Sequence, residues 1–177
     1  KLYPYVDYFA VNVSSPNTPN LRDLQDAKPL KELLQLLVDL RDKRSTRRPI
    51  LLKIAPDLST DQFDQVLEIV QEVKLDGLIA TNTTLSRDGL ASKDKDEKGG
   101  LSGKPLFDQS TDMINYIHKK TDGKLPIIGV GGVFTAEDAQ EKLDAGASLV
   151  QVYTGFAYEG PAMVRSMNKG LVKNSNE

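Results

Sequence analysis

Two alternating hydrophobic patterns run along the chain and predict strands separated by helices. Short apolar runs, each followed within two residues by Gly, Pro, Asn or Ser, cover residues 8–13, 50–54, 77–80, 126–130 and 148–153. Between them, apolar residues recur at helical spacing, as in Leu30, Leu33, Leu34 and Leu37. The sequence therefore predicts an α/β fold in which strands and helices alternate.

Residues that start helices support these helical segments. Ser59 with Gln62, and Thr135 with Asp138, have the spacing of capping boxes, in which two side chains satisfy free backbone N–H groups reciprocally. Pro29 suits a first helical position, because proline lacks the N–H that a first turn leaves unbonded. We therefore expect helices to begin close to these three places.

Strands that are apolar along their length and joined by helices indicate a parallel sheet, either doubly wound or part of a (β/α)₈ barrel. The side chains that could carry chemistry decide between the two, because nearly all of them follow the carboxyl end of a strand, where barrel enzymes keep their sites. A barrel needs about 250 residues, and this chain has 177. We predict a single domain, residues 1–177, that covers about the last five βα units of a TIM barrel.

Composition and charge exclude several classes of protein. Apolar residues make up 39% of the chain, and 23 basic residues balance 25 acidic ones, so we expect a soluble chain that does not bind nucleic acid. The absence of cysteine excludes disulfides, thiolate metal sites and a cysteine nucleophile within this sequence. No metal site is expected.

Three glycine-rich segments point to a phosphorylated ligand. They are residues 99–103, 129–132 and 153–155, in successive loops. Glycine lets backbone N–H groups approach an anion, and the last loops of a barrel often bind phosphate. Each segment taken alone is equally well explained as a tight turn. None has the spacing of a Walker or Rossmann motif.

Lys53 lies within an apolar strand, where a charge is unfavourable unless an anion meets it. Three interpretations remain open from the residue alone. Lys53 stabilises negative charge on a ligand, forms a Schiff base with a carbonyl substrate, or is paired with an internal carboxylate.

Amides and hydroxyls follow two of the strands, in residues 12–18 and 81–84, and suit a planar polar ligand. Turn and cap formation is the alternative explanation for either segment. Ser15 is a candidate nucleophile or base. His118, the only histidine, is expected on the surface near a helix end, so no Ser-His-Asp triad is predicted.

Together these motifs closely resemble dihydroorotate dehydrogenase, in order and spacing, over essentially the whole chain. The resemblance rests on residues 12–18, 21–25, 53–57, 81–84, 99–105, 129–133 and 145–154. It is to the class 2, quinone-linked enzymes, because Ser15 stands where class 1 enzymes carry cysteine.

The resemblance implies an FMN protein that oxidises dihydroorotate to orotate in pyrimidine synthesis and passes electrons to quinone. Ser15 would be the catalytic base. The substrate would be held by Asn12, Asn17, Asn82 and Thr83. The FMN would contact Asn12, Lys53, Thr81, Ser102, Gly103, Gly131, Gly132, Tyr153 and Thr154. Residues 16–28 would form a lid over the substrate.

The family also has N-terminal strands and membrane-associating helices that this sequence does not contain. By resemblance, the complete enzyme would be peripheral on the cytoplasmic side of the inner membrane, with membrane contact only through that missing segment. The chain alone is then expected to self-associate or to need a complementing N-terminal segment, and to be inactive by itself. Two alternatives remain: a Schiff-base lyase that uses Lys53, and an inactive phosphate-binding partial barrel.

Overall fold

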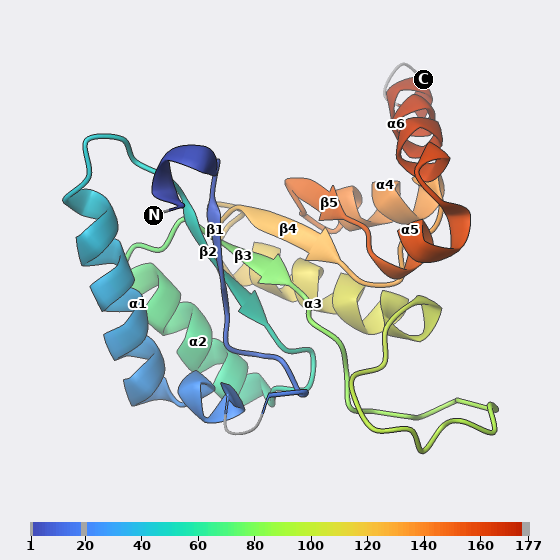
Figure 1. The fold of residues 1–177 in the computed structure, drawn as a ribbon, viewed down its shortest axis with the longest axis horizontal. Helices are drawn as coiled ribbons and strands as arrows, with labels where there is room; N and C mark the ends of the chain where they lie inside the picture. Colours follow the sequence, from blue (N-terminus) through green and yellow to red (C-terminus); the bar gives the residue numbers. More distant parts are fainter. Residues whose placement is uncertain (1, 19–20, 175–177) are drawn as a thin grey trace.

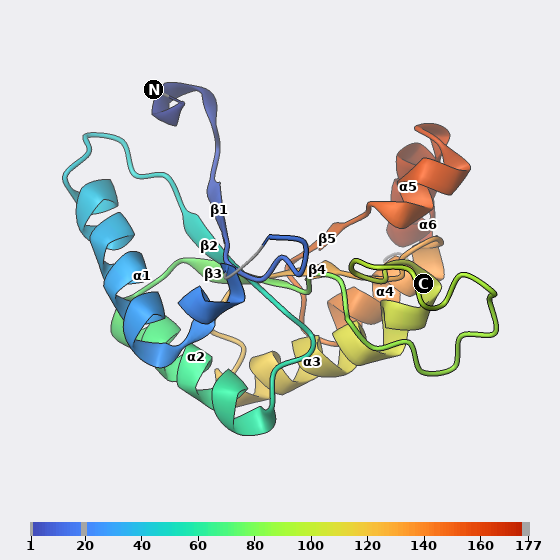
Figure 2. The same ribbon diagram turned by 60° about the horizontal axis from the view of Figure 1, so that its bottom comes forward.

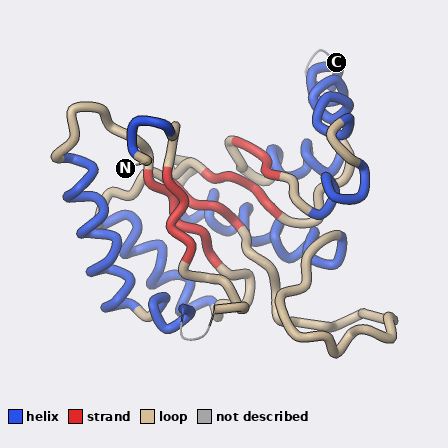
Figure 3. Tube along the Cα trace, viewed as in Figure 1, coloured by secondary structure: helices blue, strands red, loops and turns tan. Residues whose placement is uncertain are grey.

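The centre of the molecule is a sheet of five parallel strands, seen in a computed structural model that describes residues 2–18 and 21–174 (Figures 1 and 3). The strands are β1 (Phe9–Asn12), β2 (Ile50–Ile54), β3 (Gly77–Ala80), β4 (Ile127–Val130) and β5 (Leu149–Gln151). Each lies within a run predicted from the sequence. All four neighbouring pairs are parallel.

Helices connect the strands as predicted. They are α1 (Ala27–Asp42), α2 (Thr60–Glu72), α3 (Phe107–Lys120) and α4 (Ala136–Asp144), with α5 (Thr154–Glu159) and α6 (Ala162–Asn174) after β5. Single 3₁₀ turns cover η1 (Tyr3–Tyr5), η2 (Leu21–Gln25) and η3 (Lys104–Leu106). Both predicted capping boxes are present, at the starts of α2 and α4.

The predicted role of Pro29 as the first residue of its helix is wrong. The helix α1 begins two residues earlier, at Ala27, after the N-cap Asp26. Pro29 still lies within the first turn, where backbone N–H groups have no partner inside the helix, so the proline does not interrupt it.

The strand order identifies the barrel arrangement. The strands are hydrogen bonded in the order β1-β2-β3-β4-β5, without the reversal that a doubly wound sheet requires. Because parallel crossovers are right-handed, an order that always advances in one direction places the connecting helices on one face. Figure 2 shows α1, α2 and α3 along one side of the sheet. The fold is a partial α/β barrel.

Alternation along the strands creates a core on each face of the sheet. The face toward the helices carries Leu52, Leu78 and Ile127, which pack with α1, α2 and α3 in the larger cluster. The opposite face, which corresponds to the barrel interior, carries Leu51, Ile79, Ile128 and Val130. Lys53 lies two residues after Leu51 and so belongs to the inner face.

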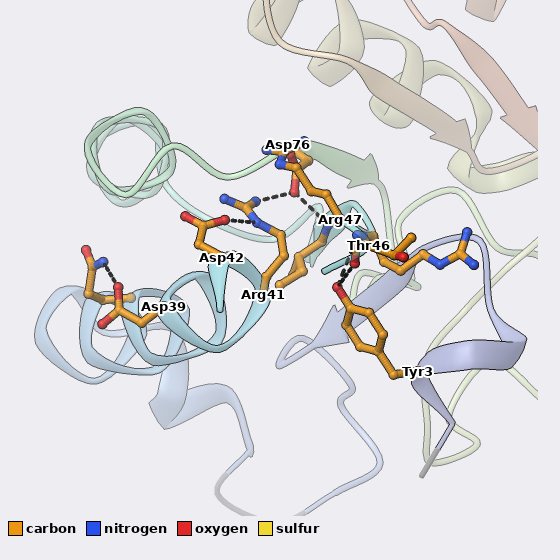
Figure 4. A network of polar contacts seen from close by, with 10 residues as sticks. Tyr3, Asp39, Arg41, Asp42, Thr46, Arg47 and Asp76 are labelled. Atoms are coloured by element: carbon orange, nitrogen blue, oxygen red, sulfur yellow. Dashed lines mark hydrogen bonds and ion pairs between the residues drawn. The ribbon is translucent and has the colours of Figure 1, made fainter. Parts of the chain in front are cut away.

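A polar network joins α1 to the amino ends of two strands (Figure 4). Asp76, directly before β3, accepts hydrogen bonds from Arg41 of α1 and from Arg47, and its carboxylate also accepts from the backbone N of Ile50 at 2.8 Å. Arg41 is 4% exposed. This network lies at the amino ends of the strands, opposite their carboxyl ends, so it contributes to the stability of the fold. The sequence analysis did not identify it.

Candidate functional site at the carboxyl ends of the strands

The loops that follow β1, β3, β4 and β5, together with Lys53 of β2, surround a cavity of about 360 Å³. Its wall is formed by twenty residues, of which twelve are among the thirteen predicted site residues. These twelve are Ser15, Asn17, Lys53, Thr81, Asn82, Thr83, Ser102, Gly103, Gly131, Gly132, Tyr153 and Thr154. Residues separated by more than 130 positions in the sequence are thus brought to one hollow.

Asn12, the remaining predicted residue, does not line the cavity itself but is hydrogen bonded to Asn82, which does. Its side-chain Oδ1 accepts hydrogen bonds from Nδ2 of Asn82 at 3.1 Å and from Oγ of Ser14 at 3.2 Å. Asn82 Nδ2 also donates to Ser14 Oγ at 2.9 Å. These contacts lock the side chain of Asn82 between the ends of β1 and β3.

Ser14 has a structural role that the sequence did not predict. It is fully buried, and its Oγ lies 2.8 Å from the backbone oxygen of Lys53. Ser14 therefore connects the end of β1 to the end of β2, directly beside Ser15. Ser14 differs from Ser15 in being buried, and the hydrophobic periodicity of so short a strand cannot predict which of the two serines is buried.

Lys53 reaches the cavity from the inner face of the sheet, between Asn12 on β1 and Ile79 on β3. Burial lowers the pKa of its ammonium group below the ordinary lysine value. Within the part of the chain that the structure describes, no carboxylate forms an ion pair with Lys53. The internal pairing left open by the sequence is therefore not observed there, and the cation is available to an anionic or electron-rich ligand.

The loop after β4 brings backbone close to the cavity through two glycines. Gly131 and Gly132 have φ angles of +131° and +73°. A Cβ on Gly132 would lie 2.5 Å from Cβ of Phe107, at the start of α3. Side chains are excluded there by backbone conformation and by contact, so the loop presents peptide groups to the cavity.

The loops after β3 and β5 meet on the other side of the same region. Thr154 Oγ1 donates to Ser102 Oγ at 2.9 Å, and a Cβ on Gly103, with φ of +85°, would lie 3.2 Å from the Thr154 side chain. Hydroxyl groups and glycine backbone from three loops thus converge. Such a set fits a phosphate group, since it offers several hydrogen-bond donors in a small space.

Ser15 and Asn17 form the wall nearest β1. Ser15 is half-buried, and its Oγ accepts a hydrogen bond from the backbone N of Asn17 at 3.3 Å. His118 is exposed at the carboxyl end of α3, as predicted, and does not line the cavity. The predicted lid of residues 16–28 is only partly visible, because residues 19 and 20 lie outside the described part of the chain.

Arg87 organises the loop that carries the 99–103 glycine segment, and the sequence analysis did not single it out. Its guanidinium donates to a set of backbone oxygens on both arms of this loop. The set comprises Thr84, Leu85, Ser86, Lys95, Glu97 and Gly99. Thr84 and Leu101 also pair as an antiparallel bridge at the base of the loop. Arg87 therefore fixes the approach of Gly99 and Gly100 to the cavity.

The fold and the cavity together define a class of protein: a segment of a (β/α)₈ barrel with a polar, glycine-walled ligand site at the carboxyl ends of its strands. Comparison with known proteins narrows this class. The family model described as dihydroorotate dehydrogenase matches residues 1–174, and this chain belongs to that family.

Individual relatives agree with this assignment. A dihydroorotate dehydrogenase (quinone) of Christiangramia forsetii is 59% identical over 172 residues, which are 97% of this chain and 51% of the relative. One of Thermosynechococcus vestitus is 50% identical, covering 100% of this chain and 50% of the relative. The crystal structure of a ligand-free dihydroorotate dehydrogenase of Eimeria tenella has a TM-score of 0.94 at 36% identity, covering 99% of this chain and 53% of that one.

The chain spans about half the length of the curated relatives it matches. Among the residues that the structure describes, no helix combines the length and the apolar character needed to cross a bilayer.

Proposed function

We propose that the protein oxidises dihydroorotate to orotate with FMN as cofactor and passes the electrons to a quinone. The single observation that carries the proposal is the convergence of Ser15, Lys53, Asn82 and Gly131 on one cavity. Membership of the family gives the reaction class, and relatives named for quinone as acceptor support the choice of electron acceptor.

The phosphate of FMN would be held by the loop after β4 and by two hydroxyls. Gly131 and Gly132 leave room for backbone N–H groups to approach an anion, and the hydrogen-bonded pair Ser102 and Thr154 lines the same cavity. Gly103 and Tyr153 complete this part of the wall. The site thus has donors where the ligand carries most of its negative charge.

Lys53 and Thr81 would contact the flavin ring. When bound, FMN supplies the two-electron chemistry by accepting a hydride from the substrate. Lys53 places a positive charge on the inner face of the sheet, where it stabilises the negative charge that the ring gains on reduction. Its lowered pKa reflects burial and not an internal partner, so an anionic ligand is expected to raise that pKa again.

The substrate would lie between the β1 and β3 ends, held by Asn12, Asn17, Asn82 and Thr83. The hydrogen bonds that lock Asn82 fix the direction of its amide before a ligand arrives, which favours one orientation of a small planar molecule. Ser15 Oγ would take the proton from C5 of dihydroorotate and release its own hydroxyl proton to water. Two C–H bonds of the substrate are then broken. The C5–H bond gives its proton to Ser15, and the C6–H bond gives up its hydrogen as a hydride.

Spectroscopy of the protein mixed with its substrate tests this proposal. The protein in its natural form is expected to show a flavin absorption spectrum. This spectrum should bleach when dihydroorotate is added without oxygen, and the colour should return when a quinone is added. A flavin that stays oxidised contradicts the proposal. Borohydride trapping of substrate on Lys53 would favour the lyase, and a colourless protein that binds phosphate would favour the inactive partial barrel.

A further inference from the structure

Lys142 of α4 is a lysine with no contact with solvent. It is 0% exposed, its Cβ lies close to Gly129 of β4, and its Nζ reaches the first turn of α3. The ammonium Nζ donates to the backbone oxygen of Phe107 at 2.8 Å, to Ser110 Oγ at 2.6 Å, and to Thr111 Oγ1. Among the described residues no carboxylate forms an ion pair with it. Three uncharged oxygens and the ring of Phe107, whose centroid lies 4.1 Å from Nζ, therefore hold a buried cation that has no ion-pair partner among the described residues.

The residues that hold Lys142 also hold the glycine loop after β4. Ser110 Oγ lies 3.3 Å from the backbone oxygen of Gly131, and a Cβ on Gly131 would lie only 2.6 Å from that Oγ. Gly132 lies against Phe107 in the same way. Since Lys142 occupies a lone pair of Ser110 Oγ, the single hydroxyl proton is left for the carbonyls of Phe107 and Gly131. Lys142 is thus connected to the cavity wall through two residues.

A cation in this position is incompletely compensated. Burial lowers the pKa of Lys142 to about 8. The charged groups that face it are carboxylates, Glu141 and Asp138 on α4 and Asp108 and Asp112 on α3, and they oppose this shift without cancelling it. An anion on the far side of Gly131 would supply the missing countercharge, and the cavity lies on that side.

We propose that Lys142 is a positioning residue for the phosphate of the ligand: through Ser110 and Phe107 it fixes the glycine loop, and its charge attracts the phosphate from behind that loop. This inference rests on the proposed binding of FMN. It assigns to a residue outside the cavity a share of the selectivity for a phosphorylated flavin over an unphosphorylated one.

The test compares the affinities of the protein for FMN and for riboflavin, which lacks the phosphate. Lys142→Met removes the charge and leaves a side chain of similar length, and should lower the ratio of FMN to riboflavin affinity by about tenfold. The matched control is Lys124→Met, at an exposed lysine paired with Asp122, which should leave the ratio unchanged. If Lys142 only supports the fold, both affinities fall together and the ratio stays constant, which would overturn the proposal.

Ser110→Ala keeps the charge and removes the bond to Gly131, so it remains informative if Lys142→Met fails to fold. We expect it to lower the ratio by about threefold, less than loss of the charge does. An unchanged ratio in this variant would refute the connection through Ser110.

The pH dependence of the same ratio distinguishes charge from packing. A bound phosphate dianion raises the pKa of Lys142, which means that FMN binds more tightly when Lys142 is protonated. Binding at a pH near or above 8 therefore takes up protons, and the affinity for FMN falls as the pH rises. The affinity ratio should therefore fall between pH 7 and 10 in the unmodified protein and in Ser110→Ala, and should be flat in Lys142→Met. FMN and riboflavin meet the same carboxylates and the same Lys53, so the contributions of these groups cancel in the affinity ratio. A flat profile in the unmodified protein contradicts the inference, whereas failure to bind either flavin would instead contradict the proposed function.

Discussion

Substitution of one glycine at the cavity, compared with a glycine of nearly equal φ elsewhere, tests how tightly the loop after β4 packs against α3. Gly132 has φ of +73° and Gly160 has φ of +72°. A Cβ on Gly132 would lie 2.5 Å from Cβ, 2.7 Å from Cα and 2.9 Å from N of Phe107, whereas a Cβ on Gly160 would meet nothing within 4 Å. Alanine at either position has an unfavourable positive φ, but only alanine at Gly132 also collides with neighbouring atoms.

The expected stability difference follows from these distances. A positive φ costs alanine about 1 to 3 kcal/mol at each position. Close contact with backbone atoms, which cannot rotate away, adds about 2 kcal/mol at Gly132 alone. Gly132→Ala should thus lower the free energy of unfolding by about 2 kcal/mol more than Gly160→Ala does, and for a domain of this size the difference corresponds to about 4 to 8 °C in Tm.

Urea unfolding and FMN titration of the two variants form the assay. Gly132→Ala should also bind FMN at least about tenfold more weakly, because the loop must move from α3 to accommodate the methyl group, while Gly160→Ala should bind normally. Equal losses of stability would show that the contact with Phe107 is not as tight as described. Equal FMN affinities would show that the loop after β4 does not hold the phosphate.

Three further changes test other parts of the account. Ser15→Ala should slow flavin reduction by dihydroorotate by about 100-fold or more in stopped-flow measurements, with orotate affinity nearly unchanged, and equal reduction rates would remove Ser15 from the role of base. Lys53→Met should weaken FMN retention by about tenfold and lower the flavin reduction potential, so an unaltered flavin content and potential would argue against its contact with the ring. Asp76→Asn should destabilise the protein by about 2 kcal/mol in urea because it leaves the buried Arg41 with Asp42 as its remaining ion-pair partner, and the exposed Asp122→Asn should change stability by less than about 0.5 kcal/mol.

Much of the fold could be predicted from local patterns. The runs at 50–54 and 77–80 coincide with β2 and β3, because continuous apolar segments between turn residues have few alternatives to a buried strand. The side chains of Ser59 and Thr135 cap their helices as expected. The short helix α5 was not predicted, since its six residues lack a helical repeat of apolar positions.

The cavity could be anticipated because parallel strands bring their carboxyl ends to one edge, so residues that follow strands must meet. Lys142 and Arg87 could not be anticipated in the same way. Both act through backbone oxygens supplied by other segments, and a lysine or arginine in a polar stretch normally indicates a solvated surface. Their partners depend on how α3 and the 86–99 loop pack, and no spacing in the sequence encodes that packing.

A crystal structure of the protein with FMN and orotate tests the central claim most directly. We expect phosphate density within hydrogen-bond distance of the backbone at Gly131 and Gly132, the flavin ring beside Lys53, and orotate between Ser15 and Asn82. Density for the flavin at any other place, or a phosphate remote from the loop after β4, would contradict it.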